Sequence, residues 1–320
     1  MDVVFYEVFS EEEKELKKRL SKNIRAEFKE ATIQSYPTNT PPAEVICIRT
    51  QSIIPDHWQP KLRAIFSRST GFDHLNRLLL HQKNGLQLGY LPNYCARSVA
   101  EHAILTTLAL LKKLKKQLFH FNTFNRSGLT GKNAMGRNVL IVGAGKIGSQ
   151  IAQIAQCFGM HVRAVDIVQN HSFLEYISLE KGLKISDVVI CALPLTNETR
   201  GMLDYKTLST LSKGSLFINI SRGEISPLAD LEKLLEEDIL SGLALDVYEE
   251  ESKLAAFLES GIEAATDSFK RIMRLKDREN VIFTPHNAFN SLDDLEKKAE
   301  LSCLALKMFS ETGKFPEASA

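Results

Sequence analysis

Three glycines in the middle of the chain have the spacing of a phosphate-binding turn. The apolar run 139–142 leads directly into Gly143, Gly145 and Gly148, and a helical pattern follows at once. In this spacing the first glycine allows a tight turn, the second leaves room for the backbone to approach an anion, and the third lets the helix pack closely on the strand. The amide groups at the start of such a helix attract negative charge. The motif therefore predicts a site for the pyrophosphate of a dinucleotide.

An acidic residue follows the next predicted strand, 162–165. Asp166 lies at the distance from the glycines at which a carboxylate accepts hydrogen bonds from ribose hydroxyls. The same carboxylate would repel a 2′-phosphate, so the sequence predicts NAD rather than NADP. Arg163 lies in the same strand, but its side chain is expected on the face of Val165 and not with Asp166. Three glycines alone also occur at ordinary helix starts, and the flanking strands and the acid favour the dinucleotide site.

An arginine, a glutamate and a histidine follow three further predicted strands. Arg222 comes after the strand 215–218, Glu251 after the strand that ends at residue 245, and His286 after the strand 281–283. Ligands of open α/β sheets bind at the carboxyl ends of the strands. A guanidinium binds a carboxylate through two parallel hydrogen bonds, and an imidazole can pass a proton to a carbonyl oxygen as a hydride arrives. Taken singly, these residue types are also common as surface or structural groups, but together they suit the reduction of a 2-keto acid.

The elements that must position these residues alternate between short β-rich runs and helical patterns. Strands are predicted at 3–8, 44–48, 62–66 and 86–88, and then at 139–142, 162–165, 188–192, 215–220, 242–245 and 281–283. Continuous apolar strands separated by helices are typical of parallel sheets covered on both faces. We therefore predict an α/β fold with two doubly wound parallel-sheet domains.

Two helices are expected to connect these domains. An apolar helix begins at Ser98, between the two groups of strands, and the last helix, 292–309, is expected to cross back and complete the first domain. The predicted division is therefore residues 1–97 with 292–320, against residues 98–291.

A basic stretch follows the connecting helix. Residues 112–116 include four lysines, and Leu111, Leu114 and Leu118 recur between them at helical spacing. Such runs are usually a solvated helix face. The spacing favours an amphipathic arm that packs on the core or on a second subunit, rather than a surface that binds nucleic acid or a membrane.

Composition excludes several other classes of protein. The chain has 320 residues, 44% of them hydrophobic and 25% charged, and 40 basic residues against 39 acidic leave a formal charge of +1, which gives no general attraction to nucleic acid. The five cysteines are scattered and never spaced as Cys-x-x-Cys, so we expect buried thiols in a reducing compartment and no metal site. No leader and no membrane-spanning run is recognisable, so we expect a cytoplasmic protein.

Together these segments resemble the NAD-dependent D-isomer-specific 2-hydroxyacid dehydrogenases. The matching segments are Arg68-Ser-Thr-Gly-Phe-Asp-His, Tyr94 with the later Ser98-Val-Ala-Glu-His, the glycine turn, Cys191-Ala-Leu-Pro-Leu-Thr, Asn219-Ile-Ser-Arg-Gly, Ala244-Leu-Asp-Val and Thr284-Pro-His. The resemblance implies a Rossmann NAD-binding domain, a smaller flavodoxin-like substrate domain and a homodimer. It also implies an active site in a cleft, reversible reduction of a 2-keto acid to the D-2-hydroxy acid with NADH, and catalytic roles for Arg222, Glu251 and His286.

The resemblance further implies a set of binding residues. The cofactor would be bound by Gly143, Gly145, Lys146, Ile147, Gly148, Asp166, Pro194, Thr199, Ser221, Arg222 and Asp246, with Asp246 reaching the nicotinamide carboxamide. The substrate would be bound by Ser69, Thr70, Gly71, Tyr94 and Arg222. Ser69 to Gly71 is also ordinary turn chemistry, and an aromatic residue such as Tyr94 before a helix is more often part of a core.

Two alternatives stay open at this point. Glu249, Glu250 and Glu251 are adjacent, and Glu251 is chosen because the family's acid lies five positions beyond the aspartate of its Leu-Asp-Val motif. After it, a charged and partly helical insertion, 252–280, departs from many members and resembles the lactate-type ones. The second alternative is a corepressor-like protein that senses NAD(H), because such proteins keep the same three residues.

Overall fold

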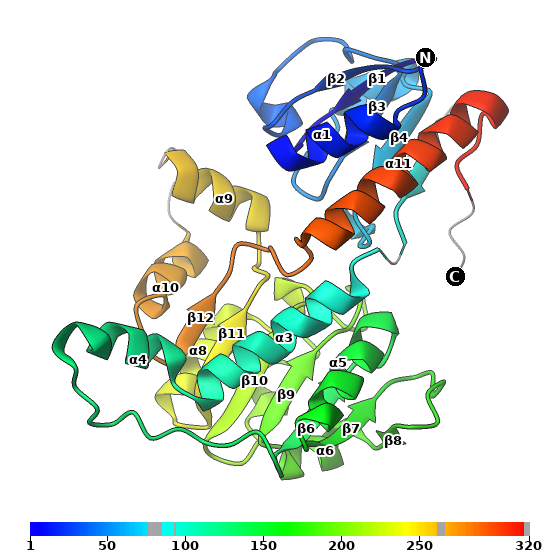
Figure 1. Ribbon diagram of the computed structural model, residues 1–320. Coiled ribbons are helices and arrows are strands. Elements are labelled where there is room, and N and C mark those ends of the chain that lie inside the picture. Colours follow the sequence, from blue (N-terminus) through cyan, green and yellow to red (C-terminus); the bar gives the residue numbers. More distant parts are fainter. Residues whose placement is uncertain (76–77, 79–84, 93, 261–265, 317–320) are drawn as a thin grey trace. The chain divides into compact units, whose positions relative to one another are not determined.

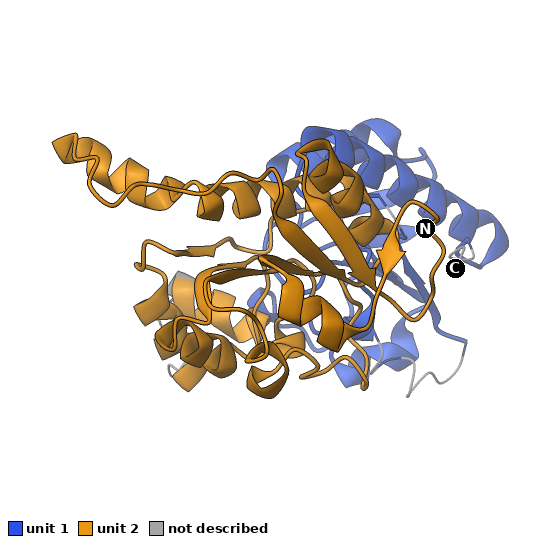
Figure 2. Cartoon of the chain, turned by 90° about the horizontal axis from the view of Figure 1, so that it is seen from below, with its two compact units in different colours: residues 1–95, 290–320 blue, residues 96–289 orange. Residues whose placement is uncertain are grey.

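The computed structural model describes residues 1–75, 78, 85–92, 94–260 and 266–316, which form two compact units (Figures 1 and 2). Unit 1 comprises Met1–Cys95 and Asn290–Ala320, and unit 2 comprises Ala96–Phe289. The boundaries predicted from the sequence lie two residues from these divisions. Each unit has a sheet of its own, with every strand pair parallel.

Unit 1 has a five-stranded sheet in the flavodoxin-like order β2-β1-β3-β4-β5. The strands are β1 (Asp2–Phe5), β2 (Arg25–Phe28), β3 (Val45–Ile48), β4 (Ala64–Ser67) and β5 (Gln87–Tyr90). The helices α1 (Ser10–Arg19) and α11 (Leu292–Thr312) pack against each other, as Figure 1 shows, so the last helix completes the first unit. The sequence missed β2, because this edge strand is polar and only partly buried and lacks an apolar pattern.

A buried ionic cluster ties the end of β4 to these two helices. Glu12 Oε1 lies 3.1 Å from Arg68 Nε and 3.0 Å from Lys298 Nζ, and all three side chains are at most 1% exposed. Burial lowers the pKa of Lys298 to about 8, against the opposing attraction of Glu12. Because an unpaired charge at such depth is costly, each of these residues depends on the others. Arg68, which the resemblance quoted, is thus an internal anchor of unit 1.

Unit 2 has a seven-stranded sheet in the order β12-β11-β10-β9-β6-β7-β8. Its strands are β6 (Asn138–Val142), β7 (His161–Val165), β8 (Glu175–Tyr176), β9 (Val188–Cys191), β10 (Ser215–Asn219), β11 (Leu240–Leu245) and β12 (Val281–Phe283). The order reverses between β6 and β9, which is the Rossmann arrangement with its ligand-binding switch point. The sequence missed β8, because two residues are too few to produce a periodic signal.

Helices cover both faces of this sheet. Unit 2 contains α3 (Ala96–Leu111), α5 (Lys146–Cys157), α6 (Leu179–Ile185), α7 (Tyr205–Leu208), α8 (Leu228–Glu236), α9 (Glu251–Ser260) and α10 (Asp267–Leu275), and also α4 (Leu114–His120), which extends away from the sheet (Figure 1). On one face of the sheet, the side chains of every second strand residue, such as Val189, Phe217 and Leu243, form a hydrophobic core with α8 and α10. The helices α3 and α5 pack together and contact strands of the sheet. The insertion is therefore partly helical as predicted, and its second helix contributes to the core, while residues 261–265 of it lie outside the described part.

The five cysteines are free thiols, and four of them are buried as expected. The expectation of burial is wrong for Cys157, which is exposed because it ends the last turn of α5 on the solvent side. Among the residues that the structure describes, no helix is both long and apolar enough to cross a membrane.

Candidate active site

The carboxyl ends of six strands in unit 2 lie at one level of the sheet. In the pairing register, Val165 lies opposite Val142, Val142 opposite Cys191, Cys191 opposite Asn219, Asn219 opposite Leu245, and Leu245 opposite Phe283. Asp166, Gly143, Arg222, Asp246 and His286 each come within three residues after one of these positions. The predicted site residues of unit 2 are thus gathered along one edge, where α/β sheets bind ligands.

The glycine turn has the geometry that its spacing predicts. Gly143 has φ +100°, and a Cβ there would lie 2.6 Å from the carbonyl oxygen of Ala192, so only glycine fits. A Cβ on Gly148 would collide with the carbonyl oxygen of Gly143, whereas a Cβ on Gly145 would meet nothing within 4 Å. The helix α5 begins at Lys146, and no side chain of the described residues caps it at Gly145. Its first amide groups can therefore hold a pyrophosphate, which is the fit expected for a dinucleotide.

Asp166 is held against this turn. Its Oδ2 accepts a hydrogen bond from Ala144 N at 2.6 Å, and its Oδ1 accepts one from Val168 N at 2.9 Å. Each carboxylate oxygen has a second lone pair, so both can still accept from a ribose hydroxyl. Arg163 instead donates to Glu175 Oε2 at 2.9 Å and to Asn138 at 3.2 Å. The nearby arginine is therefore engaged along the strands and is not placed to receive a 2′-phosphate.

Pro194 and Thr199 are joined in the loop that follows β9. Thr199 Oγ1 donates to Pro194 O at 2.7 Å and accepts from Thr196 N at 2.8 Å. These hydrogen bonds give a short polar loop a fixed shape next to the glycine turn, since β9 pairs with β6.

His286 and Glu251 form a direct pair. His286 Nδ1 lies 2.6 Å from Glu251 Oε1, with side chains 22% and 20% exposed. An ionised carboxylate can only accept, so Nδ1 carries the proton in this pair and Nε2 is left for other partners. The pair thus fixes both the ring orientation and the nitrogen that can face a substrate.

The two neighbouring glutamates point elsewhere. Glu249 accepts a hydrogen bond from Leu228 N at 3.0 Å, at the start of α8, and Glu250 forms an ion pair with Lys253. Glu250 has φ +52°, so the chain reverses there before α9 begins at Glu251. The structure therefore pairs Glu251, and neither neighbour, with His286.

Arg222 lies on a turn that is held by hydrogen bonds to the side chain of Asn219. The buried Asn219 side chain donates to Arg222 O at 2.9 Å and accepts from Ser221 N at 2.9 Å. A Cβ on Gly223 would collide with the backbone of Tyr248 and Glu249. The arginine turn therefore packs directly on the loop that leads to Glu251, and Ser221 lies within it.

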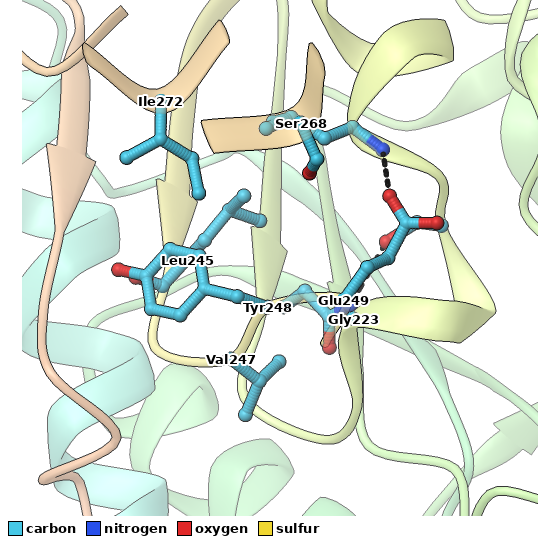
Figure 3. Close-up of a pocket in the computed structure, with 10 residues that line it drawn as sticks. Gly223, Leu245, Val247, Tyr248, Glu249, Ser268 and Ile272 are labelled. Carbon is cyan, nitrogen blue, oxygen red and sulfur yellow. Dashed lines mark hydrogen bonds between the residues drawn. The ribbon is translucent and has the colours of Figure 1, made fainter. Parts of the chain in front are cut away.

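A small pocket lies behind these loops (Figure 3). It is lined by Asn219, Gly223, Ser226, Leu228, Leu245, Val247, Tyr248, Glu249, Ser268 and Ile272. The figure shows Glu249 hydrogen-bonded at one side and the Tyr248 ring facing Leu245 and Ile272 on the other. Burial, with the negative charges of Asp246 and Glu251, raises the pKa of Tyr248, so its hydroxyl stays a donor to the carbonyls of Leu245 and Thr284. Because none of Arg222, Glu251 and His286 lines it, this pocket supports the site and is not the place of reaction.

Asp246, expected to reach a nicotinamide, is 2% exposed and contacts the histidine segment. Its Oδ1 accepts from Thr284 Oγ1 at 2.5 Å and from Asn287 N at 2.9 Å, and its Oδ2 accepts from Ala288 N at 2.9 Å. No role was predicted for Thr284 or for His102, whose Nε2 lies 3.1 Å from Thr284 Oγ1. A polar residue on the largely apolar α3 is the signal that could have identified His102.

The substrate-binding residues that the resemblance placed in the first domain belong to unit 1. Ser69 Oγ lies 2.6 Å from Ser67 Oγ and donates to Gly71 O at 3.2 Å, and Thr70 Oγ1 lies 3.7 Å from Cys95 Sγ. Tyr94 is 5% exposed, and burial raises the pKa of its hydroxyl. Ser69 to Gly71 therefore form a tied turn, and most of the Tyr94 ring is inside unit 1.

Comparison with known proteins agrees with the predicted family and with an NAD-binding unit 2. Residues 102–288 match the family model described as D-isomer specific 2-hydroxyacid dehydrogenase, NAD binding domain, which covers nearly all of unit 2. The chain is 30% identical to a D-lactate dehydrogenase of Curvularia clavata over 268 residues, which is 81% of this chain and 76% of that protein. It is 33% identical to 2-hydroxyacid dehydrogenase A of Aspergillus oryzae over 253 residues, 78% of this chain and 72% of that protein.

A solved structure extends the likeness to both units. The crystal structure of a D-lactate dehydrogenase from Aquifex aeolicus, complexed with NAD and lactic acid, has a TM-score of 0.86 and 29% sequence identity. The match covers 99% of this chain and 100% of that one. The NAD-binding domain predicted from the glycine turn and Asp166 is thereby confirmed for unit 2.

Proposed function

Because the chain belongs to the D-isomer-specific 2-hydroxyacid dehydrogenase family, we propose that it interconverts a small 2-keto acid and the D-2-hydroxy acid with NAD(H). One observation carries this proposal more than any other. His286 and Glu251 are paired at 2.6 Å at the carboxyl ends of the strands, the same edge of the sheet from which the NAD-binding turn follows β6. A histidine oriented by a carboxylate at a nicotinamide site is what proton transfer to a carbonyl oxygen requires.

The proposed roles follow from the contacts of each side chain. NAD, when bound, supplies or accepts the hydride. In the protonated imidazole of His286, Nδ1–H donates to Glu251 and Nε2–H gives its proton to the substrate oxygen. In the reverse direction, the neutral Nε2 accepts that proton. Arg222 binds the substrate carboxylate, since a guanidinium offers two parallel donors. The resemblance adds Ser69, Thr70, Gly71 and Tyr94 of unit 1 to the proposed substrate-binding residues.

The direct test is a spectrophotometric scan of NADH oxidation. Pyruvate, hydroxypyruvate, glyoxylate and branched 2-keto acids would be tried in turn, and the product of any active substrate analysed for the D configuration. We expect saturable oxidation with at least one of them. If none of them caused NADH oxidation at high protein concentration, while NADH binding was intact, the proposed enzymatic function would be contradicted and the corepressor-like alternative favoured.

Replacement of Asp166 by alanine is expected to narrow the preference for NADH over NADPH. The carboxylate accepts hydrogen bonds from the ribose hydroxyls of NADH and repels the 2′-phosphate of NADPH. Its loss should therefore weaken the binding of NADH and remove the repulsion of NADPH. The measurement is the ratio of kcat/KM with the two cofactors. Arg163→Ala is the matched control, because Arg163 contacts Glu175 and Asn138, and its ratio should not change. An unchanged ratio in Asp166→Ala would mean that the carboxylate does not face the ribose.

We also propose that the protein is a homodimer that uses the arm formed by α4 and residues 121–135. The lysines of the arm are turned inward: Lys115 Nζ lies near three backbone carbonyls of residues 276–281, and Lys116 pairs with Glu279 at 2.8 Å. The large apolar side chains are exposed instead, namely Leu118 at 67%, Phe119 at 71%, Phe121 at 74%, Phe124 at 76% and Met135 at 77%. An apolar set of this size is typical of a surface that another protein covers.

A charged pair on this arm is expected to separate the subunits. The double variant Phe119→Glu with Phe121→Glu should elute as a monomer, because two buried carboxylates in an apolar interface are costly. The mass is measured by light scattering across a range of concentrations. Leu304→Glu, on α11 of unit 1 and 52% exposed, is the control and should keep the wild-type mass. A wild-type protein that is monomeric at micromolar concentration would contradict the proposal.

A further inference from the structure

The backbone at His286 needs support from its surroundings. His286 has φ +49°, in the left-handed region that side chains other than glycine seldom adopt. Such a conformation persists only where neighbouring groups hold the chain in place. Neighbouring groups must therefore hold this segment in place while the imidazole exchanges a proton.

One carboxylate binds the segment on both sides of His286. Asp246 accepts from Thr284 Oγ1 at 2.5 Å, two residues before the histidine, and from Asn287 N and Ala288 N at 2.9 Å after it. Asp246 follows β11 and Thr284 follows β12, which pair in parallel, so the carboxylate is fixed to the sheet. Three hydrogen bonds to Asp246, one before His286 and two after it, therefore hold the left-handed backbone conformation of this residue.

The hydroxyl of Thr284 links this carboxylate to α3. A threonine hydroxyl has one hydrogen, and the short contact to the ionised Asp246 takes it. The remaining contact, to His102 Nε2 at 3.1 Å, then has the imidazole as donor. His102 lies on α3, which packs against β11 and β12. The hydrogen bonds therefore run in one direction, from His102 through Thr284 to Asp246.

We propose that His102 and Thr284 are positioning residues that act through Asp246 to hold His286 in its reactive orientation. This inference rests on the proposed function, in which His286 exchanges a proton with the substrate. Asp246 itself is unsuited to the test, because the resemblance also places it at the nicotinamide. Thr284 and His102 allow the positioning role to be measured without that overlap.

The first test compares two substitutions of Thr284. Thr284→Val keeps the shape but removes the hydroxyl, and we expect kcat to fall about tenfold while the KM for the keto acid and the Kd for NADH change less than about threefold. Thr284→Ser restores the hydroxyl and should return kcat to within about threefold of wild type. A valine variant as fast as wild type, or a serine variant as slow as valine, would overturn the proposal.

The second test does the same for His102. His102→Leu removes the donor and should lower kcat several-fold, whereas His102→Gln places an amide nitrogen near the position of Nε2 and should recover most of the loss. Glu101→Gln is the control on the same helix, because Glu101 is 58% exposed and pairs with Arg97. Equal kcat values for the leucine and glutamine variants would remove His102 from the proposal.

Amide hydrogen exchange of the 281–290 segment separates this inference from the proposed function. The amides of Asn287 and Ala288 should exchange faster in Thr284→Val than in wild type or Thr284→Ser, whether or not any substrate is turned over. A wild-type protein that oxidises no NADH would refute the proposed reaction, and unchanged exchange in Thr284→Val would refute the positioning role.

Discussion

His286→Ala is expected to lower kcat by about a hundredfold or more while NADH binding survives, which is the usual scale for losing a general acid or base. The imidazole is held by Glu251 at 2.6 Å, and alanine leaves no group to pass a proton to the substrate oxygen. The measurement is steady-state kcat, with NADH affinity followed by fluorescence.

His161→Ala is the matched control for this prediction. His161 is exposed and opens β7, so it lies at the amino end of its strand, away from the edge where the site is gathered. We expect wild-type kcat in this variant. An alanine variant at His286 that keeps comparable activity would refute its role as the proton donor.

Arg222→Lys is expected to raise the KM for the keto acid and to lower kcat together. Lysine keeps the charge but cannot offer two parallel donors to a carboxylate. A hydrogen bond to a charged group contributes roughly 1.5–3 kcal/mol, so kcat/KM should fall about tenfold to a hundredfold. Full saturation curves for the wild-type protein and for Arg222→Lys give kcat and KM separately.

Arg137→Lys controls for the exchange of residue type. Arg137 pairs with Asp187 at 3.2 Å just before β6, at the opposite edge of the sheet from Arg222. Its kinetic constants should be those of wild type. If neither KM nor kcat moves in Arg222→Lys, the arginine does not contact the substrate.

The sequence was sufficient for features that depend on neighbours along the chain. The turn at Gly143 and Gly148 follows from glycine spacing, because the collisions that exclude a side chain are built into a strand, turn and helix of fixed length. The parallel sheets follow from apolar runs separated by helices. The two missed strands, Arg25–Phe28 and Glu175–Tyr176, are polar or too short to give such a pattern.

The direction of side chains was decided by the fold. The leucines spaced through the basic run 112–116 predicted an amphipathic arm that packs on the core or on a second subunit. In the structure, Lys115 lies near backbone carbonyls and Leu118 is exposed. Helical spacing separates the two faces but does not say which of them meets the rest of the protein.

The choice among three adjacent glutamates also depended on tertiary structure. Spacing within a family indicated Glu251, but the physical reason is the reversal at Glu250 and the binding of Glu249 to the start of α8. The same holds for Asp246, whose three partners lie some forty residues farther along the chain. Spacing along the backbone determines turns and periodic elements, whereas hydrogen bonds between distant segments exist only once the strands are side by side.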